Sequence, residues 1–226
     1  METINKNEQK LSPNAGSSYG AGWDIMWKNF IALFVVFIIY SLLSGPAGAF
    51  QWKVEHFGWY MVPLILFGIG FAIFVSGPIG YSANWVFLKA VRGEKFEVKD
   101  LFAVFQRNYW NAVLGNILVA VIVGMGMVML IIPGIIFACR LAFVPYLIVD
   151  REMEVTEALT KSWEMTKGYG WDIFFMGLLA IPIGIIGLLA LIFGVIISAI
   201  WVKTSFAVMY QAVVEKEGHF QEAIEE

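Results

Sequence analysis

The chain has 226 residues, of which 59% are hydrophobic and 15% are charged, whereas soluble domains carry about 25% charged residues. This composition excludes an ordinary water-soluble domain and predicts an all-α, polytopic membrane helical bundle. The formal net charge of −3 argues against nucleic acid as a partner. Because Cys139 is the single cysteine, a disulfide framework is also excluded.

The first 22 residues are polar, rich in Asn, Ser and Gly, and contain Pro13. Such a segment buries too little apolar surface to order itself, so we expect a disordered cytoplasmic tail over residues 1–22. The membrane domain is then expected over residues 23–217. A short cytoplasmic tail is expected over residues 218–226.

Runs of apolar residues predict six transmembrane helices. The closing stretch, Trp171 to Val214, carries only two charged residues, Asp172 and Lys203, and as one helix it would extend roughly 66 Å, about twice the hydrocarbon thickness. It therefore contains two spans, with the turn expected at Gly184 to Gly187. Pro78 is expected to bend the second helix. The other four spans are expected at Asn29 to Ser44, Gly58 to Val91, Asn111 to Ile132, and Ile135 to Val149, with Pro133-Gly134 turning between the last two.

Basic residues indicate the orientation of these spans. Twelve of them fall on one side of the layout, against Lys53 alone on the other, which predicts a multi-pass protein of the cytoplasmic membrane with both termini in the cytoplasm. An alternative takes the first apolar run as a cleaved secretory signal, because Ala47-Gly48-Ala49 resembles a cleavage site. The long leader, with its acidic residues, is a poor match to the start of such a signal.

A short aromatic and polar signal opens each odd-numbered span, at Trp23-Asp24, Trp110-Asn111 and Trp171-Asp172. The ends of the even-numbered spans also match, as Val91-Arg92-Gly93-Glu94, Val149-Asp150-Arg151-Glu152 and Val214-Glu215-Lys216-Glu217. These matches favour a three-fold repeat of helical hairpins that share one direction in the membrane. The alternative is ordinary interfacial anchoring, since Trp is common at membrane boundaries.

The two connections between these hairpins are predicted to be amphipathic helices on the inner membrane surface. Thr156 is expected to cap the second of them and Gly168 to end it. Their apolar faces are carried by Val98, Leu101, Phe102 and Phe105, and by Val155, Leu159 and Trp163.

Three segments of the chain resemble a known group of membrane proteins. They read SGPIGYSANWVFLKAVRGEKFEVKDLF, LIIPGIIFACRLAFVPYLIVD and EALTKSWEMTKGYGWDIF. They are similar to bacterial multi-span families related to the membrane domain attached to some glycerophosphodiester phosphodiesterases. The resemblance implies a stand-alone polytopic membrane protein and carries over no catalytic residues, because the phosphodiesterase barrel is absent.

The sequence offers no catalytic or metal-binding motif. The two histidines, His56 and His219, have no metal-ligand partner at helical spacing, and we expect no catalytic residues, no metal and no cofactor. Carboxylates are also missing from the hydrocarbon-spanning segments, which argues against proton-coupled transport. A non-enzymatic protein is therefore expected.

Two basic residues lie within apolar runs. Lys203 follows Gly187 by 16 positions, roughly 24 Å of helix, so its long side chain is expected to reach the inner headgroups. Arg140 follows Gly134 by only six positions, roughly 9 Å, and lies too deep for this. Its charge is expected to be compensated by helix-end carbonyls or by Asn84, Asn116 or Ser198. Alternatively, Arg140 holds an anionic headgroup in an inner-leaflet cavity with Tyr81, Ser82, Asn84, Lys203, Thr204 and Ser205.

These observations favour a membrane protein that binds, senses or transports a lipid or another amphipathic anion. Its expected partners are membrane lipids, anionic phospholipid in particular, because each basic residue near an anionic leaflet adds about 1 kcal/mol of attraction. The alternative is a structural or regulatory membrane partner of another protein or of a second copy. Glycine-rich helix faces, which allow close helix packing, suit that second hypothesis equally well.

Overall fold

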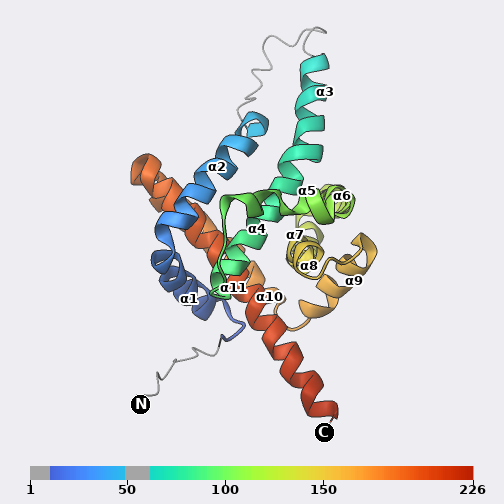
Figure 1. The fold of residues 1–226 in the computed structure, drawn as a ribbon. Coiled ribbons are helices and arrows are strands. Elements are labelled where there is room, and N and C mark those ends of the chain that lie inside the picture. Colours follow the sequence, from blue (N-terminus) through green and yellow to red (C-terminus); the bar gives the residue numbers. More distant parts are fainter. Residues whose placement is uncertain (1–10, 49–61, 226) are drawn as a thin grey trace.

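A computed structural model of the chain describes residues 11–48 and 62–225. Within these ranges the chain consists of helices and their connections, without any strand (Figure 1). The predicted all-α bundle is confirmed. Its buried core lies around Phe87, Leu147 and Tyr210, where three helices meet. These are α4 (Gly77–Val91), α8 (Val144–Asp150) and α11 (Leu191–Glu225).

The N-terminal segment is more ordered than its composition suggested. Helix α1 (Ala15–Lys28) begins inside the predicted tail, so that prediction is wrong for residues 15–22, while residues 1–10 lie outside the described part. Asn14 caps this helix by accepting a hydrogen bond from the Ser17 amide at 2.8 Å. Gly22 packs so closely on α11 that an added Cβ would lie 2.9 Å from the Ser205 Cα. The small residues that we interpreted as disorder therefore allow close helix packing.

Helix α2 (Phe30–Gly48) follows α1 after a 96° bend at Asn29. Helices α3 (Val62–Phe71) and α4 (Gly77–Val91) are joined without a break by a π-helical turn over Ala72–Ser76. The irregularity thus directly precedes Pro78, which cannot donate the hydrogen bond that a regular α-helix needs there.

Helices α6 (Tyr109–Met129) and α7 (Ile131–Arg140) form the next hairpin. The chain turns at Leu130, whose backbone is extended, and not at Pro133-Gly134 as predicted. Pro133 lies in the first turn of α7, where a missing amide breaks no helical hydrogen bond. The predicted fourth span is itself interrupted at residues 141–143, after which α8 (Val144–Asp150) resumes.

Helices α10 (Gly170–Leu189) and α11 (Leu191–Glu225) form the closing hairpin, which turns at Ala190 and not at the predicted Gly184 to Gly187. Gly187 lies opposite Gly194 of α11, where an added Cβ would be 2.7 Å from the Gly194 carbonyl oxygen. The α6–α7 hairpin is built alike, since a Cβ on Gly126 would lie 2.9 Å from the Gly134 Cα. Close glycine contacts therefore bring both pairs of helices together beside their turns.

The predicted connecting helices are present. One consists of a 3-10 turn, η4 (Val98–Phe102), followed by α5 (Ala103–Arg107), and the other is α9 (Val155–Met165). Glu154, and not Thr156, occupies the N-cap position of α9, so the predicted cap is wrong. Gly168 follows the end of α9 with φ of +89°, a left-handed conformation that favours glycine.

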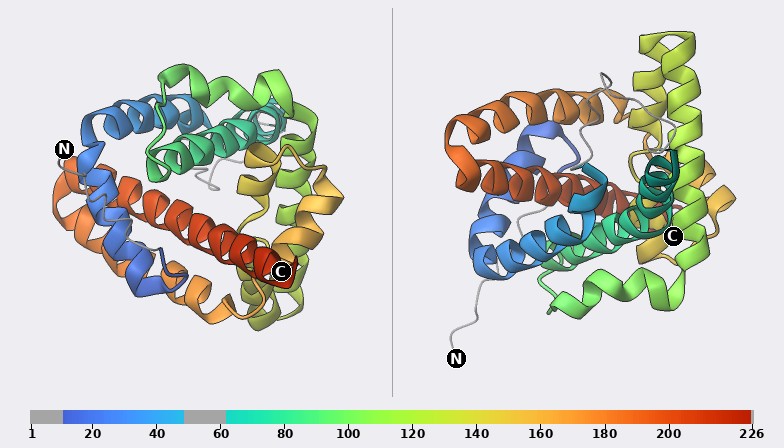
Figure 2. Two further views of the ribbon diagram at one scale, coloured as in Figure 1. Left: turned by 60° about the horizontal axis from the view of Figure 1, so that its bottom comes forward. Right: turned by 90° about the horizontal axis from the view of Figure 1, so that it is seen from above.

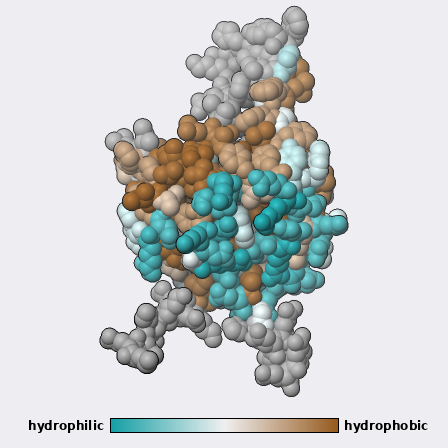
Figure 3. All heavy atoms as spheres, viewed as in Figure 1, coloured by the Kyte–Doolittle hydropathy of each residue, from teal (hydrophilic) through white to brown (hydrophobic). Residues whose placement is uncertain are grey.

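The described helices include five that are long and apolar enough to cross a membrane. The bent pair α1–α2 makes six if the two helices together form one span. The five are Ile65–Val91, Tyr109–Met129, Ile131–Asp150, Gly170–Leu189 and Phe193–Gly218. Figure 3 shows apolar surface above a broad hydrophilic region, as expected of a membrane-embedded bundle.

The two complete hairpins do not share one direction. In the right-hand view of Figure 2, α6 and α7 run across α10 and α11. The common direction expected of repeated hairpins is therefore not observed for this pair. The likeness between them is confined to their similar helix lengths and to the glycine contacts at their turns.

Candidate functional site

Arg140 ends α7 directly before the interruption of the fourth span. Its carbonyl oxygen accepts hydrogen bonds from the hydroxyls of Ser162, at 2.8 Å, and Thr166, at 3.3 Å. The Phe143 amide in turn donates to the Ser162 hydroxyl at 3.3 Å. Both hydroxyl residues are fully buried. Helix α9 thus satisfies backbone groups that the interruption of the helix leaves open.

The Arg140 guanidinium has no polar partner in the described part of the chain. Its Nη1 atom is buried and takes part in no hydrogen bond. The nearest compensation is the Trp163 ring, whose centroid lies 5.6 Å from the guanidinium carbon. The Arg140 Nη1 therefore reaches none of the acceptors considered from the sequence, which were helix-end carbonyls, Asn84, Asn116 and Ser198. Asn84 accepts instead from Lys203, and Ser198 donates to the Ile183 carbonyl. The charge of Arg140 therefore faces a space without an acceptor.

That space is a cleft of about 640 Å³ between α7 and the start of α10. Apart from the Arg140 side chain and the Cys139 thiol, its lining is apolar or glycine. The α7 wall consists of Ile132, Ile135, Ile136, Cys139 and Arg140, and the facing wall of Gly168, Gly170, Trp171 and Phe174. No carboxylate lines it. A cationic group at one end of an apolar cleft suits an anion that carries a hydrocarbon tail.

Lys203 and Asn84, which we had grouped with Arg140, contact each other away from this cleft. The Lys203 Nζ is 3.4 Å from the Asn84 Oδ1 and 5.0 Å from the centroid of the Tyr40 ring. The lysine side chain is directed into the bundle, so the expectation that it reaches the headgroups is wrong. The amide oxygen and the aromatic faces of Tyr40 and Phe87 compensate its charge inside.

The other predicted site residues serve helix packing. Tyr81 is buried, and the Ser82 hydroxyl accepts a hydrogen bond from the Val104 amide at 3.2 Å. Thr204 and Ser205 each donate to a carbonyl one turn earlier in α11, at 2.8 Å. None of the four lines the cleft at Arg140. The structure therefore separates Arg140 from the six residues with which we had grouped it.

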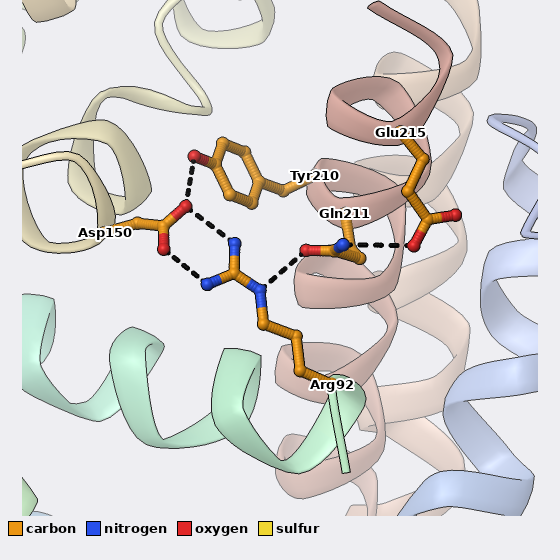
Figure 4. Close-up of polar contacts among 5 residues, drawn as sticks. All are labelled: Arg92, Asp150, Tyr210, Gln211 and Glu215. Carbon is orange, nitrogen blue, oxygen red and sulfur yellow. Dashed lines mark hydrogen bonds and ion pairs between the residues drawn. The ribbon is translucent and has the colours of Figure 1, made fainter. Parts of the chain in front are cut away.

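A polar cluster at the ends of α4 and α8 was not anticipated from the sequence (Figure 4). Arg92 binds Asp150 through two hydrogen bonds, of 2.5 Å and 2.8 Å, and the Tyr210 hydroxyl donates to the same carboxylate at 2.9 Å. The Arg92 Nε donates to the Gln211 Oε1 at 2.9 Å, and Gln211 donates to Glu215. Burial alone would lower the pKa of Arg92, but the hydrogen bond and the negative charge of Asp150 outweigh it and raise that pKa. The matching span ends, with Arg92 and Asp150 at equivalent positions, were a signal that could have revealed the pair.

Within residues 11–48 and 62–225, no group of three or more His, Cys, Asp or Glu side chains lies close enough together to hold a metal ion. No family model, curated protein or solved structure matches the chain. The fold defines the class, a helical membrane protein. The family resemblance of the three quoted segments stays a prediction, and the function follows from the site alone.

Proposed function

We propose that the chain is a non-enzymatic, multi-pass protein of the bacterial cytoplasmic membrane that binds an anionic amphiphile in the cleft between α7 and α10. Anionic phospholipid is the leading ligand class. The observation that carries the proposal is Arg140, which lines an otherwise apolar cleft and whose buried Nη1 has no hydrogen-bond partner in the described part of the chain.

Keeping the charge of Arg140 within the membrane costs free energy. A central arginine costs about 2.5 to 3.5 kcal/mol on the membrane-insertion scale. The Trp163 contact returns about 0.5 to 2 kcal/mol, depending on how dry the pair is. A bound anion would supply the missing acceptor and compensate the rest. Phosphate suits the site because a guanidinium can bind it through two parallel hydrogen bonds, which the lysine ammonium cannot copy.

The shape of the cleft supports a ligand with a tail. Its volume of about 640 Å³ falls within the range of roughly 300 to 1,000 Å³ that small-molecule sites occupy. Along α7 the wall runs from Arg140 to Ile132, which is about 12 Å of helix. The headgroup would thus lie at Arg140 while a hydrocarbon chain packs along the isoleucines toward Ile132.

The proposed orientation puts both termini in the cytoplasm, on the grounds of the uneven distribution of basic residues. In that orientation α8 leads from Arg140 to the cytoplasmic side. The cleft then opens toward the inner leaflet, whose anionic lipids would be its natural ligands.

Native mass spectrometry of the chain in mild, uncharged detergent tests the proposal. We expect retained anionic phospholipid on the wild-type chain, much less on Arg140→Lys, and none on Arg140→Leu. The matched control is Arg107→Leu, because the Arg107 side chain is 69% exposed and pairs with Glu152 at the surface. Equal retention by the wild-type chain and Arg140→Leu would overturn the proposal. A retained protein subunit in place of lipid would favour the structural-partner hypothesis.

The single cysteine gives a second readout. Cys139 lines the cleft beside Arg140, so N-ethylmaleimide can report on occupancy without further engineering. Adding phosphatidylglycerol should slow labelling of the wild-type chain and leave the labelling rate of Arg140→Leu unchanged. Slowing to the same extent in both would mean that the lipid covers Cys139 without using Arg140.

A further inference from the structure

A second cleft, of about 660 Å³, lies on the opposite side of α11, against α1. Its charge is opposite to that of the Arg140 cleft, because among the described residues that line it Asp24 carries a negative charge and none is basic. The lining residues are Leu11, Ser12, Ser17, Tyr19, Gly20, Ala21, Trp23, Asp24, Trp201 and Val208. The two clefts share no lining residue.

Three aromatic rings form its walls. Trp201 stands nearly perpendicular to Tyr19, with an interplanar angle of 82° and 5.5 Å between ring centroids. Trp23 meets Trp201 at 68° and 4.8 Å. Rings set at steep angles to each other can present π faces to a single cation from more than one side, and tryptophan has the most attractive face.

The polar atoms of two of these rings, Trp201 and Tyr19, already donate hydrogen bonds within the chain. The Trp201 Nε1 donates to the Tyr19 carbonyl at 2.9 Å, and the Tyr19 hydroxyl donates to the Met176 carbonyl at 2.8 Å. These hydrogen bonds fix both rings. Because Tyr19 is buried, the more exposed rings of Trp23 and Trp201 offer their faces to a ligand. The Ser17 hydroxyl is likewise engaged, with the Ser12 carbonyl.

Asp24 is the acidic group of this cleft. Its carboxylate takes part in no ion pair or hydrogen bond with the described residues, and it lies next to Trp23 at an exposed position. A carboxylate beside aromatic faces attracts a cation by charge and by the ring quadrupole together. The apolar remainder of the lining, such as Val208 and Leu11, accommodates a hydrocarbon body.

We propose that this cleft binds the ammonium head of a cationic or zwitterionic amphiphile, with the head held between Trp23, Trp201 and Asp24. The ammonium would be primary or alkylated. Its charge is matched by the Asp24 carboxylate, and its carbon-bound hydrogens pack against the indole faces. The attached chain leaves along the apolar lining toward the membrane.

Isothermal titration calorimetry of the full chain in uncharged detergent tests this with hexyltrimethylammonium, which carries the head on a short soluble chain. The wild-type chain should bind it saturably. Asp24→Asn and Trp23→Leu should each weaken binding about tenfold, the size expected for losing one partly desolvated charge or cation–π contact. Trp23 is chosen over Trp201 because its side chain is 39% exposed and its loss breaks no hydrogen bond.

Matched controls separate a site from general partitioning. Trp110→Leu removes a ring that is 67% exposed on α6, and Glu157→Gln removes an exposed carboxylate on α9. Both should retain wild-type affinity. The uncharged isostere with a 3,3-dimethylbutyl head should bind at least tenfold more weakly than the ammonium. Tetramethylammonium distinguishes a free ammonium ion from the headgroup of an amphiphile. If it binds more weakly than hexyltrimethylammonium, the hydrocarbon chain contributes to binding and a membrane amphiphile is supported.

Three results would overturn the proposal. They are the absence of saturable binding, wild-type affinity in both Asp24→Asn and Trp23→Leu, and equal affinity for the charged and uncharged heads. Tetramethylammonium binding as tightly as hexyltrimethylammonium would overturn the assignment to an amphiphile, because the tail would then contribute nothing. Since none of these variants touches Arg140, failure here leaves the anion site standing, and the reverse is also true.

Discussion

Arg92, at the end of α4, and Asp150, at the end of α8, are 58 positions apart in the chain and form a bidentate ion pair. The Asp150 side chain is 7% exposed and the Arg92 side chain 22%. Tyr210 of α11 donates to the same carboxylate, so three helices that build the core are connected at one point (Figure 4). Because a buried ion pair needs most of its hydrogen bonds to offset desolvation, each member depends on the others.

The first prediction concerns the loss of one partner. Asp150→Asn leaves the Arg92 charge largely buried without its counter-ion, and we expect a loss of about 3 kcal/mol in the free energy of unfolding, at the low end for buried pairs because Arg92 is partly exposed. Thermal unfolding in detergent measures it. Tyr210→Phe, which removes one charge-assisted hydrogen bond, should cost about 1.5 to 3 kcal/mol.

The control for this prediction is the Arg107–Glu152 pair, whose side chains are 69% and 56% exposed. Arg107→Ala should change stability by less than about 1 kcal/mol. The double variant Arg92→Met with Asp150→Leu should lose less than Asp150→Asn alone, since it leaves no uncompensated charge. If Asp150→Asn unfolds at the wild-type temperature, the cluster contributes nothing to stability.

The second prediction concerns the close approach of α10 and α11. Gly187→Ala would bring a Cβ within 2.7 Å of the Gly194 carbonyl oxygen, a backbone atom that cannot move aside on its own. We expect a loss of about 1 to 3 kcal/mol from the forced separation of the helices. The control is Gly184→Ala on the same helix, where an added Cβ meets nothing within 4 Å. That variant should be neutral or gain up to about 1 kcal/mol from helix propensity. Equal effects at both positions would mean that contact between the helices is not the cause.

Much of the fold could be predicted because apolar runs and their interruptions follow directly from burial in lipid. The positions of the turns could not. Pro133-Gly134 and Gly184 to Gly187 read as turns in sequence, yet both lie within helices. A proline in the first helical turn breaks no hydrogen bond, and a glycine can serve packing in place of turning. Local composition does not separate these roles, because the difference depends on which helix lies opposite.

The candidate site was predicted in part. Arg140 was singled out for its depth in the fourth span, whereas the contact between Lys203 and Asn84 was not anticipated. The residues that surround Arg140 were missed because they come from α9 and the start of α10, which the sequence placed at the membrane surface. Their arrangement depends on the interruption at residues 141–143, which directly precedes Pro145 in the first turn of α8. The proline indicates a break in the helix but not which side chains pack against it. Depth along a single helix identifies an unusual charge but not its neighbours.

The third prediction concerns orientation. Fusions of alkaline phosphatase at Arg107 and at Lys161 should be inactive, because the proposed topology, based on the uneven distribution of basic residues, has both connecting helices in the cytoplasm. Fusions of green fluorescent protein at the same two positions should fluoresce and serve as the positive control. Strong phosphatase activity at either position would reverse the proposed topology.

The fourth prediction links α9 to the Arg140 cleft through Ser162. Its buried hydroxyl donates to the Arg140 carbonyl and accepts from the Phe143 amide, so Ser162→Ala leaves both backbone groups without this partner. We expect a loss of about 1 to 3 kcal/mol in the free energy of unfolding, the cost of leaving a buried polar group unsatisfied. Thermal unfolding measures it, with Thr160→Ala as the control. Thr160 lies on the same helix, and its hydroxyl bonds only within α9 at an exposed position, so its loss should cost little.

The position of Ser162 gives this variant a second, more specific effect. With the interruption at residues 141–143 less firmly held, α7 should fluctuate at the end that carries Cys139 and Arg140. N-ethylmaleimide should then label Cys139 severalfold faster in Ser162→Ala than in the wild-type chain at a temperature where both are folded, while Thr160→Ala keeps the wild-type rate. A destabilised variant with an unchanged labelling rate would show that Ser162 supports the bundle as a whole and does not position the Arg140 cleft.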